Sequence, residues 1–171
     1  LKICTLFLCL KVTGLSAQIL NDSVTLDLIK KDVSYIYNLQ SDSADNTLLK
    51  ISNSYPEHPV VYLLKGMKTY WENFPLIPSS PARLSYENDM FTCIGLCEKK
   101  SNRDEDTEYV LASLCARGML LLFYSDNDLR REVFPLVKST YKYLRRAFDY
   151  ASVYPDFLFF TGLYNYYREA Y

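Results

Sequence analysis

Histidine and glycine are both scarce in this sequence of 171 residues, which contains one histidine and five glycines. A Ser/His/Asp or Cys/His catalytic arrangement would have to use His58, which stands between Glu57 and Pro59 just before a predicted helix. We therefore interpret His58 as a loop residue or helix cap. Nucleophile-elbow, zinc-protease, phosphate-loop and dinucleotide motifs are also missing. The sequence predicts a protein that is not an enzyme, without catalytic residues or a cofactor.

Cysteine is too rare for a disulfide scaffold, because only Cys93, Cys97 and Cys115 follow residue 18 and their number is odd. The spacing of Cys93 and Cys97 could present two thiolates to a metal, but no third and fourth ligand accompany them. We expect these cysteines on an apolar helix face and no metal site. The carboxylates at positions 104, 105, 106 and 108 cluster in one turn, which favours a solvated helix N-terminus over a catalytic pair.

The sequence also lacks a strong excess of positive or negative charge. The sequence has 19 basic and 20 acidic residues, with a formal net charge of −1. No strong field would attract the protein to nucleic acid or to an anionic membrane. We predict no nucleic-acid partner.

One long apolar run lies at the beginning of the sequence. Lys2 is followed by an apolar run at residues 3–10 and by small residues at positions 16 and 17, the order of a secretory signal peptide. The run is interrupted at Lys11 and falls short of the about 20 apolar residues that a membrane-spanning helix needs. A cleaved signal peptide at residues 1–17 is predicted, with an ordinary N-terminal core helix as the alternative. We expect a secreted or periplasmic protein of the cell envelope, with no membrane span after cleavage.

What the sequence does contain is helical periodicity. Apolar residues recur at intervals of three and four, and no stretch alternates as a half-buried strand would. We predict an all-α fold in one domain at residues 18–171, in which short loops make neighbouring helices antiparallel. About six to seven helices are expected, at residues 23–39, 44–54, from 59, 80–100, 107–124, 129–154 and from 156.

Three details accompany these helices. The helix at residues 107–124 is apolar nearly all round and is expected at the centre of the fold. Residues 30–32 are assigned to the polar face of the first helix. Because the last helix reaches Tyr171 without a capping glycine, we expect the sequence to be a fragment, truncated at its C-terminus.

A glycine followed by an aromatic pair recurs in three of the predicted helices. Gly66 precedes Tyr70 and Trp71, and Tyr-Pro steps occur at residues 55–56 and 154–155. This pattern resembles the tetratricopeptide repeat, in which a glycine permits close helix packing and an aromatic residue follows one turn later. The glycines in question, expected to lie at helix–helix contacts, are Gly66, Gly118 and Gly162.

The resemblance covers roughly residues 29–171, and the glycine spacing is irregular compared with the 34-residue period of the repeat. Residues 150–171 also resemble part of the repeat-bearing exported bacterial proteins. What the resemblance implies is a short α-solenoid of stacked hairpins that binds partners on a surface.

Tyrosine is unusually frequent, with 16 residues. Exposed tyrosines on a concave surface are common recognition residues, so we hypothesise a partner-binding groove. Its predicted lining is Tyr62, Tyr70, Tyr164 and Tyr167. The first hypothesis is a non-catalytic scaffold or adaptor for a protein or peptide partner. The alternative is an envelope protein that binds a solute or glycan in an aromatic-lined groove, and a third is an enzyme whose catalytic part lies outside this sequence.

Overall fold

The computed structural model describes residues 19, 22–100 and 107–170, with the helical backbone alone at residues 167, 168 and 170. The predicted signal peptide at residues 1–17 lies outside the described residues, as does most of the predicted acidic turn. Within the described chain there are seven helices and no strand, which confirms the all-α prediction. The helices are α1 (Ser23–Tyr37), α2 (Ser41–Ser54), α3 (Pro59–Glu72), α4 (Ala82–Lys100), α5 (Thr107–Asp126), α6 (Arg130–Tyr150) and α7 (Asp156–Ala170).

Local chemistry determines where several of these helices begin. The Asp22 carboxylate accepts the N–H groups of Val24 and Thr25 and thereby caps α1. His58 caps α3, because its Nδ1 accepts the N–H of Val60 at 3.2 Å, and Pro59 follows as the first helical residue. The predicted cap at His58 is therefore confirmed.

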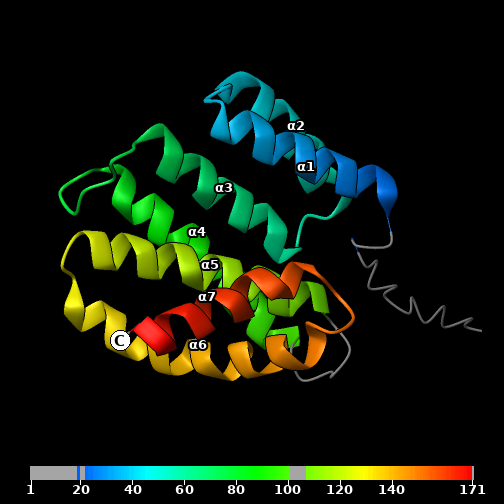
Figure 1. The fold of residues 1–171 in the computed structure, drawn as a ribbon. Helices are drawn as coiled ribbons and strands as arrows, with labels where there is room; N and C mark the ends of the chain where they lie inside the picture. The colour runs from blue at the N-terminus through cyan, green and yellow to red at the C-terminus, as the bar shows by residue number, and fades with distance from the viewer. Residues whose placement is uncertain (1–18, 20–21, 101–106, 171) are drawn as a thin grey trace, which may run out of the picture.

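The helices form antiparallel hairpins that stack in chain order. The pairs α1/α2, α3/α4 and α5/α6 pack as hairpins, and α1, α3, α5 and α7 also pack on one another in sequence. Figure 1 shows this progression from α1 and α2 at the top of the molecule to α6 and α7 at the bottom. Each helix thus contacts only near neighbours along the chain, as expected for a solenoid.

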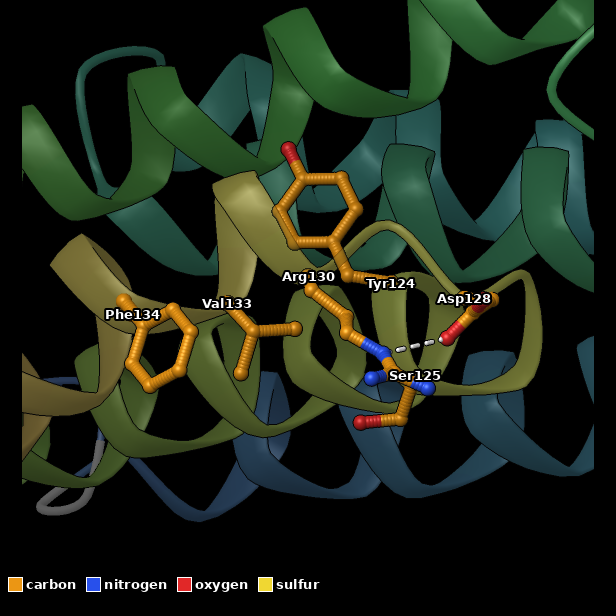
Figure 2. A pocket seen from close by; sticks show the side chains of 6 residues that line it. All are labelled: Tyr124, Ser125, Asp128, Arg130, Val133 and Phe134. Atoms are coloured by element: carbon orange, nitrogen blue, oxygen red, sulfur yellow. Dashed lines mark hydrogen bonds and ion pairs between the residues drawn. The ribbon is translucent and has the colours of Figure 1, made fainter.

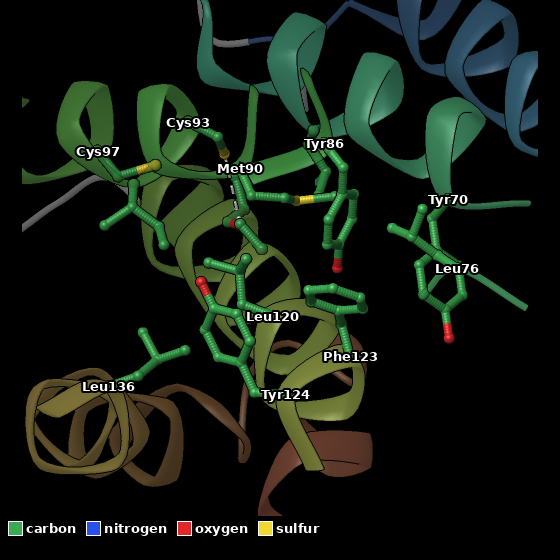
Figure 3. Packing of buried hydrophobic residues seen from close by; sticks show 14 of the residues in the cluster. Tyr70, Leu76, Tyr86, Met90, Cys93, Cys97, Leu120, Phe123, Tyr124 and Leu136 are labelled. Carbon is green, nitrogen blue, oxygen red and sulfur yellow. Dashed lines mark hydrogen bonds between the residues drawn. The ribbon is translucent and has the colours of Figure 1, made fainter. Parts of the chain in front are cut away.

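The hydrophobic core follows the same progression, in three clusters. One lies among α1, α2 and α3, a second and larger one among α3, α4 and α5, and a third among α5, α6 and α7. Figure 3 shows the second cluster, where Tyr86 and Met90 of α4 meet Leu120 and Phe123 of α5. With eleven buried residues, against six on α3, α5 has the most buried positions of the described helices and is the central helix.

Candidate functional site

The four tyrosines proposed to line a groove do not come together. Tyr62 and Tyr70 lie on α3, which packs on α1, α2, α4 and α5, whereas Tyr164 lies on α7, which packs on α5 and α6. Tyr70 is only 3% exposed and belongs to the core, so its predicted role in partner binding is wrong. Its ring lies 5.5 Å from that of Tyr86, and burial raises the pKa of its hydroxyl.

The other three tyrosines have different surroundings. Tyr62 is half-buried, with the Lys65 ammonium 5.2 Å from its ring centroid. Tyr164 is half-buried on α7 and its ring centroid lies 5.8 Å from that of Phe148 on α6. The side chain of Tyr167 lies outside the described residues. Of the three whose side chains are described, Tyr164 is the one on α7.

The three predicted packing glycines also differ. Gly66 is buried, and a Cβ atom there would lie 2.6 Å from Cε of Met90, so α3 and α4 approach closely at this point. Gly118 and Gly162 are exposed, and a Cβ at either would meet no described heavy atom within 4 Å. The predicted packing role is therefore corrected for these two glycines, since no neighbouring helix in the described structure requires a glycine there.

The main exposed apolar surface is on α6 and α7. Of the nineteen large apolar side chains that are exposed in the described chain, ten lie between residues 134 and 166. Large contiguous exposed apolar patches usually mark interaction sites in soluble proteins. We call the first group the outer stripe of α6, and it consists of Phe134, Val137, Tyr141 and Phe148. We call the second group the open face of α7, and it consists of Phe159, Gly162, Leu163 and Tyr166.

The spacing of these residues explains why they form stripes. On α6 the exposed apolar residues follow at intervals of three, four and seven, so they share one side of the helix. The opposite side of α6 has its own apolar residues, Leu136, Tyr143 and Ala147, which are buried in the core. The ring contact between Phe148 and Tyr164 joins the two helices. We refer to the outer stripe of α6 and the open face of α7 together as the α6–α7 surface.

Cations border the outer stripe of α6. This helix has six basic and two acidic residues, whereas the whole sequence has a formal net charge of −1. Lys138, Lys142 and Arg145 are exposed among the apolar residues of the stripe. The outer stripe of α6 therefore combines apolar side chains with a local positive field. The net charge of the whole sequence does not reveal this local excess of basic residues.

A shallow pocket of about 230 Å³ lies at the first turn of α6. It is lined by residues of the α5–α6 turn together with Val133 and Phe134 of α6, and Arg130 donates to Asp128 at 2.8 Å at its rim (Figure 2). Because Phe134 also belongs to the outer stripe of α6, the pocket continues the α6–α7 surface. It is large enough for a side chain but below the range of ordinary small-molecule sites.

Two buried polar groups were not foreseen from the sequence. Glu108, predicted to be solvated, is buried, and its Oε1 lies 3.4 Å from Nε2 of His58. Because Nδ1 of His58 accepts the N–H of Val60, Nε2 is the nitrogen that donates to Glu108. This pair links the start of α3 to the first turn of α5. Asp32, placed on a polar face, is instead fully buried.

Arg117 is a third buried polar residue, at the centre of the fold. Its guanidinium donates to Ser113 of α5 at 3.1 Å, to Ser139 of α6, and to Glu98 of α4 at 2.7 Å. The ring of Tyr143 lies 4.8 Å away. With these contacts the charge is satisfied, so we interpret Arg117 as a structural connection of three helices.

Of the described cysteines, Cys93 and Cys97 lie in the core and Cys115 packs against it. Cys93 and Cys97 are free and buried on α4, and the hydrogen bond with Cys97 together with burial raises the pKa of Cys93. No group of three potential metal ligands occurs among the described residues. None of the described helices is both long and apolar enough to cross a membrane.

The fold and its surface define an all-α protein of stacked helical hairpins with one apolar, cation-bordered face. Comparison with known proteins gives no match to a family model, to a curated protein or to a solved structure.

Proposed function

We propose that this protein is a non-catalytic interaction scaffold of the cell envelope, built from hairpins like those of tetratricopeptide repeats. It binds a protein or peptide partner through the α6–α7 surface. The observation on which the proposal rests is the concentration of exposed apolar side chains there, with Phe159 67% and Tyr166 66% exposed. Burying such side chains against a partner would contribute roughly 25 cal/mol per Å² of apolar area.

The surface also has the composition of an interaction site. Aromatic residues predominate on it, and aromatic side chains are enriched at the energetic centres of interfaces. Its exposed cations provide a polar rim, which would steer an acidic partner toward the apolar stripe.

Site-specific photocrosslinking in the source cells tests this proposal. A photoreactive phenylalanine analogue replaces Tyr166, or replaces Phe91 as a control that is 49% exposed on α4. We expect a discrete protein adduct from position 166 and none from position 91, and the adduct should disappear when Phe159→Ser is added. Equal adducts from both positions, or none from position 166, would contradict the proposal.

A second candidate function is binding of a glycan, and the exposed rings of Tyr141 and Tyr166 favour it. Aromatic faces can stack on apolar ligand surfaces, including sugar rings. A thermal-shift screen against oligosaccharides separates the two functions. Saturable stabilisation by a sugar that is lost in Tyr166→Ala would favour the glycan.

A further inference from the structure

The buried side of α1 is mostly polar. Of the fifteen residues of this helix, three are buried, and they are Thr25, Asp32 and Ile36. Ile36 belongs to the apolar cluster among α1, α2 and α3, where the partly buried Ile29 and Val33 pack beside it. One buried aliphatic side chain with partly buried neighbours makes a modest hydrophobic contribution to the docking of α1. The state of a buried carboxyl group can therefore decide whether α1 stays docked.

Asp32 is the buried residue of α1 that can carry a charge. Its side chain is fully buried, and neither Oδ1 nor Oδ2 has a hydrogen-bond partner in the described structure. Burying an ionised carboxylate without a partner costs far more free energy than burying a protonated carboxyl group. The docked position of α1 is therefore compatible with a protonated Asp32 and opposed by an ionised one.

The helices α2 and α3 pack on α1, and each has a charged group that acts on Asp32. The Asp45 carboxylate of α2 opposes ionisation of Asp32, and the Lys68 ammonium of α3 favours it. Lys68 is already engaged, because its Nζ lies 3.1 Å from Asp45 and 3.0 Å from Glu72. An ionised Asp32 therefore receives no hydrogen bond while α1 is docked, whereas water would donate to it once α1 moves away.

We propose that Asp32 is a proton-dependent switch for the docking of α1. The helix is docked on α2 and α3 when Asp32 carries a proton, and it is released locally when Asp32 is ionised and reaches water. Release uncovers the apolar residues of α2 and α3 in the same cluster, among them Ile51 and Leu64. The other two clusters contain no described residue of α1, so the rest of the stack keeps its core.

The pH range of the switch follows from the two states of the carboxyl group. Burial, together with Asp45, raises the pKa of the docked Asp32 to about 7, whereas an aspartate in water has a pKa of about 3.9. Between these values the docked helix holds a proton that the released helix loses, so release is favoured by up to about tenfold per pH unit. Above about pH 7 both states are ionised and the shift ends. Release is therefore favoured about a hundredfold more at pH 8 than at pH 5.

Native-state hydrogen exchange of the full chain at pH 5 and pH 8, followed by mass spectrometry, tests this inference. Protection factors of α1, corrected for the intrinsic effect of pH on exchange, should fall by about a hundredfold at pH 8. Asp32→Asn preserves the shape but cannot ionise, so it should show no such fall, and Asp32→Leu is a second variant without a titratable group. Asp27→Asn is the matched control on α1, with a side chain that is 70% exposed, and should behave like the unmodified chain.

Urea separates local release of α1 from unfolding of the whole molecule. The urea dependence of an opening reaction scales with the surface that it exposes. Exchange of α1 at pH 8 should therefore depend on urea much less than exchange of α5, the central helix, does. Circular dichroism at both pH values verifies that each variant is folded.

Three results would overturn the inference. Equal protection of α1 at pH 5 and pH 8 in the unmodified chain would show that ionisation of Asp32 does not release the helix. A fall in Asp32→Asn and Asp32→Leu as large as in the unmodified chain would assign the effect to another group. A urea dependence of α1 equal to that of α5 would mean that Asp32 affects the stability of the whole fold and releases no single helix.

Discussion

Asp32 is the side chain whose environment conflicts most with its chemistry. It is fully buried on α1, and neither carboxylate oxygen has a hydrogen-bond partner in the described structure. Burial, together with the Asp45 carboxylate of α2, raises its pKa to about 7, although the Lys68 ammonium of α3 acts in the opposite direction. The carboxyl group is therefore protonated in the folded protein over a pH range in which it is ionised in the unfolded chain.

This difference predicts the sign of a pH dependence. Between about pH 4 and pH 7 the folded state binds the proton more strongly, so the free energy of unfolding decreases as the pH rises. Asp32→Asn should remove this decrease and stabilise the protein at pH 8 by about 1–4 kcal/mol. Urea unfolding at pH 5 and pH 8 measures both the pH dependence and the stabilisation. Asp27→Asn, on the exposed side of α1, is the control. An unchanged pH slope in Asp32→Asn would show that Asp32 is not the group responsible.

The glycines provide a second prediction at the scale of single residues. Gly66→Leu should destabilise the protein by about 1–3 kcal/mol, because the added atoms collide with Met90 in a packed core. Gly118→Ala and Gly162→Ala should each stabilise it by up to about 1 kcal/mol, since alanine is the better helix former and space is available. Thermal unfolding of the three variants measures the contrast. A destabilised Gly162→Ala would mean that this position is already covered in the free protein.

At the scale of helices, Arg117 connects α4, α5 and α6. Arg117→Ala should lower the free energy of unfolding by about 3 kcal/mol, since it removes three hydrogen bonds and a ring contact from a buried position. Arg117→Lys should recover only part of this, because an ammonium cannot reach Ser113, Ser139 and Glu98 together. Chemical denaturation measures both, with exposed Arg145→Ala as the control. Full recovery by lysine would show that charge alone matters.

The sequence predicted the helices well where the signal is local. The starts of α1, α3, α5 and α7 were predicted at the observed residues, because Asp22, Pro59 and similar caps act on their own neighbours. Other ends were missed: α2 begins at Ser41 instead of 44, and α6 ends at Tyr150 instead of 154. Pro155 disfavours a helical conformation only at Tyr154, and no comparable local signal marks the end at Tyr150.

Burial, by contrast, could not be predicted from the pattern. Tyr70 and Tyr166 stand in the same pattern, four residues after a glycine, yet Tyr70 is buried and Tyr166 is exposed. The difference comes from α4, which covers one helix and has no equivalent on the other in the described structure. Asp32 is a partial exception, since its spacing from Ile29 and Ile36 already places it on the apolar side of α1.

At the scale of the molecule, stability should decrease toward α7. The cluster among α3, α4 and α5 has fifteen buried apolar residues, whereas the one beneath α7 has five, so opening α7 costs less. Amide hydrogens of α7 should therefore exchange about a hundredfold faster than those of α5, measured by hydrogen exchange with mass spectrometry.

The gradient follows from the way the hairpins stack. Each helix packs only on its near neighbours, so α7 can open without disturbing the cluster among α3, α4 and α5. Equal protection of α7 and α5 in the free protein would contradict the graded stability.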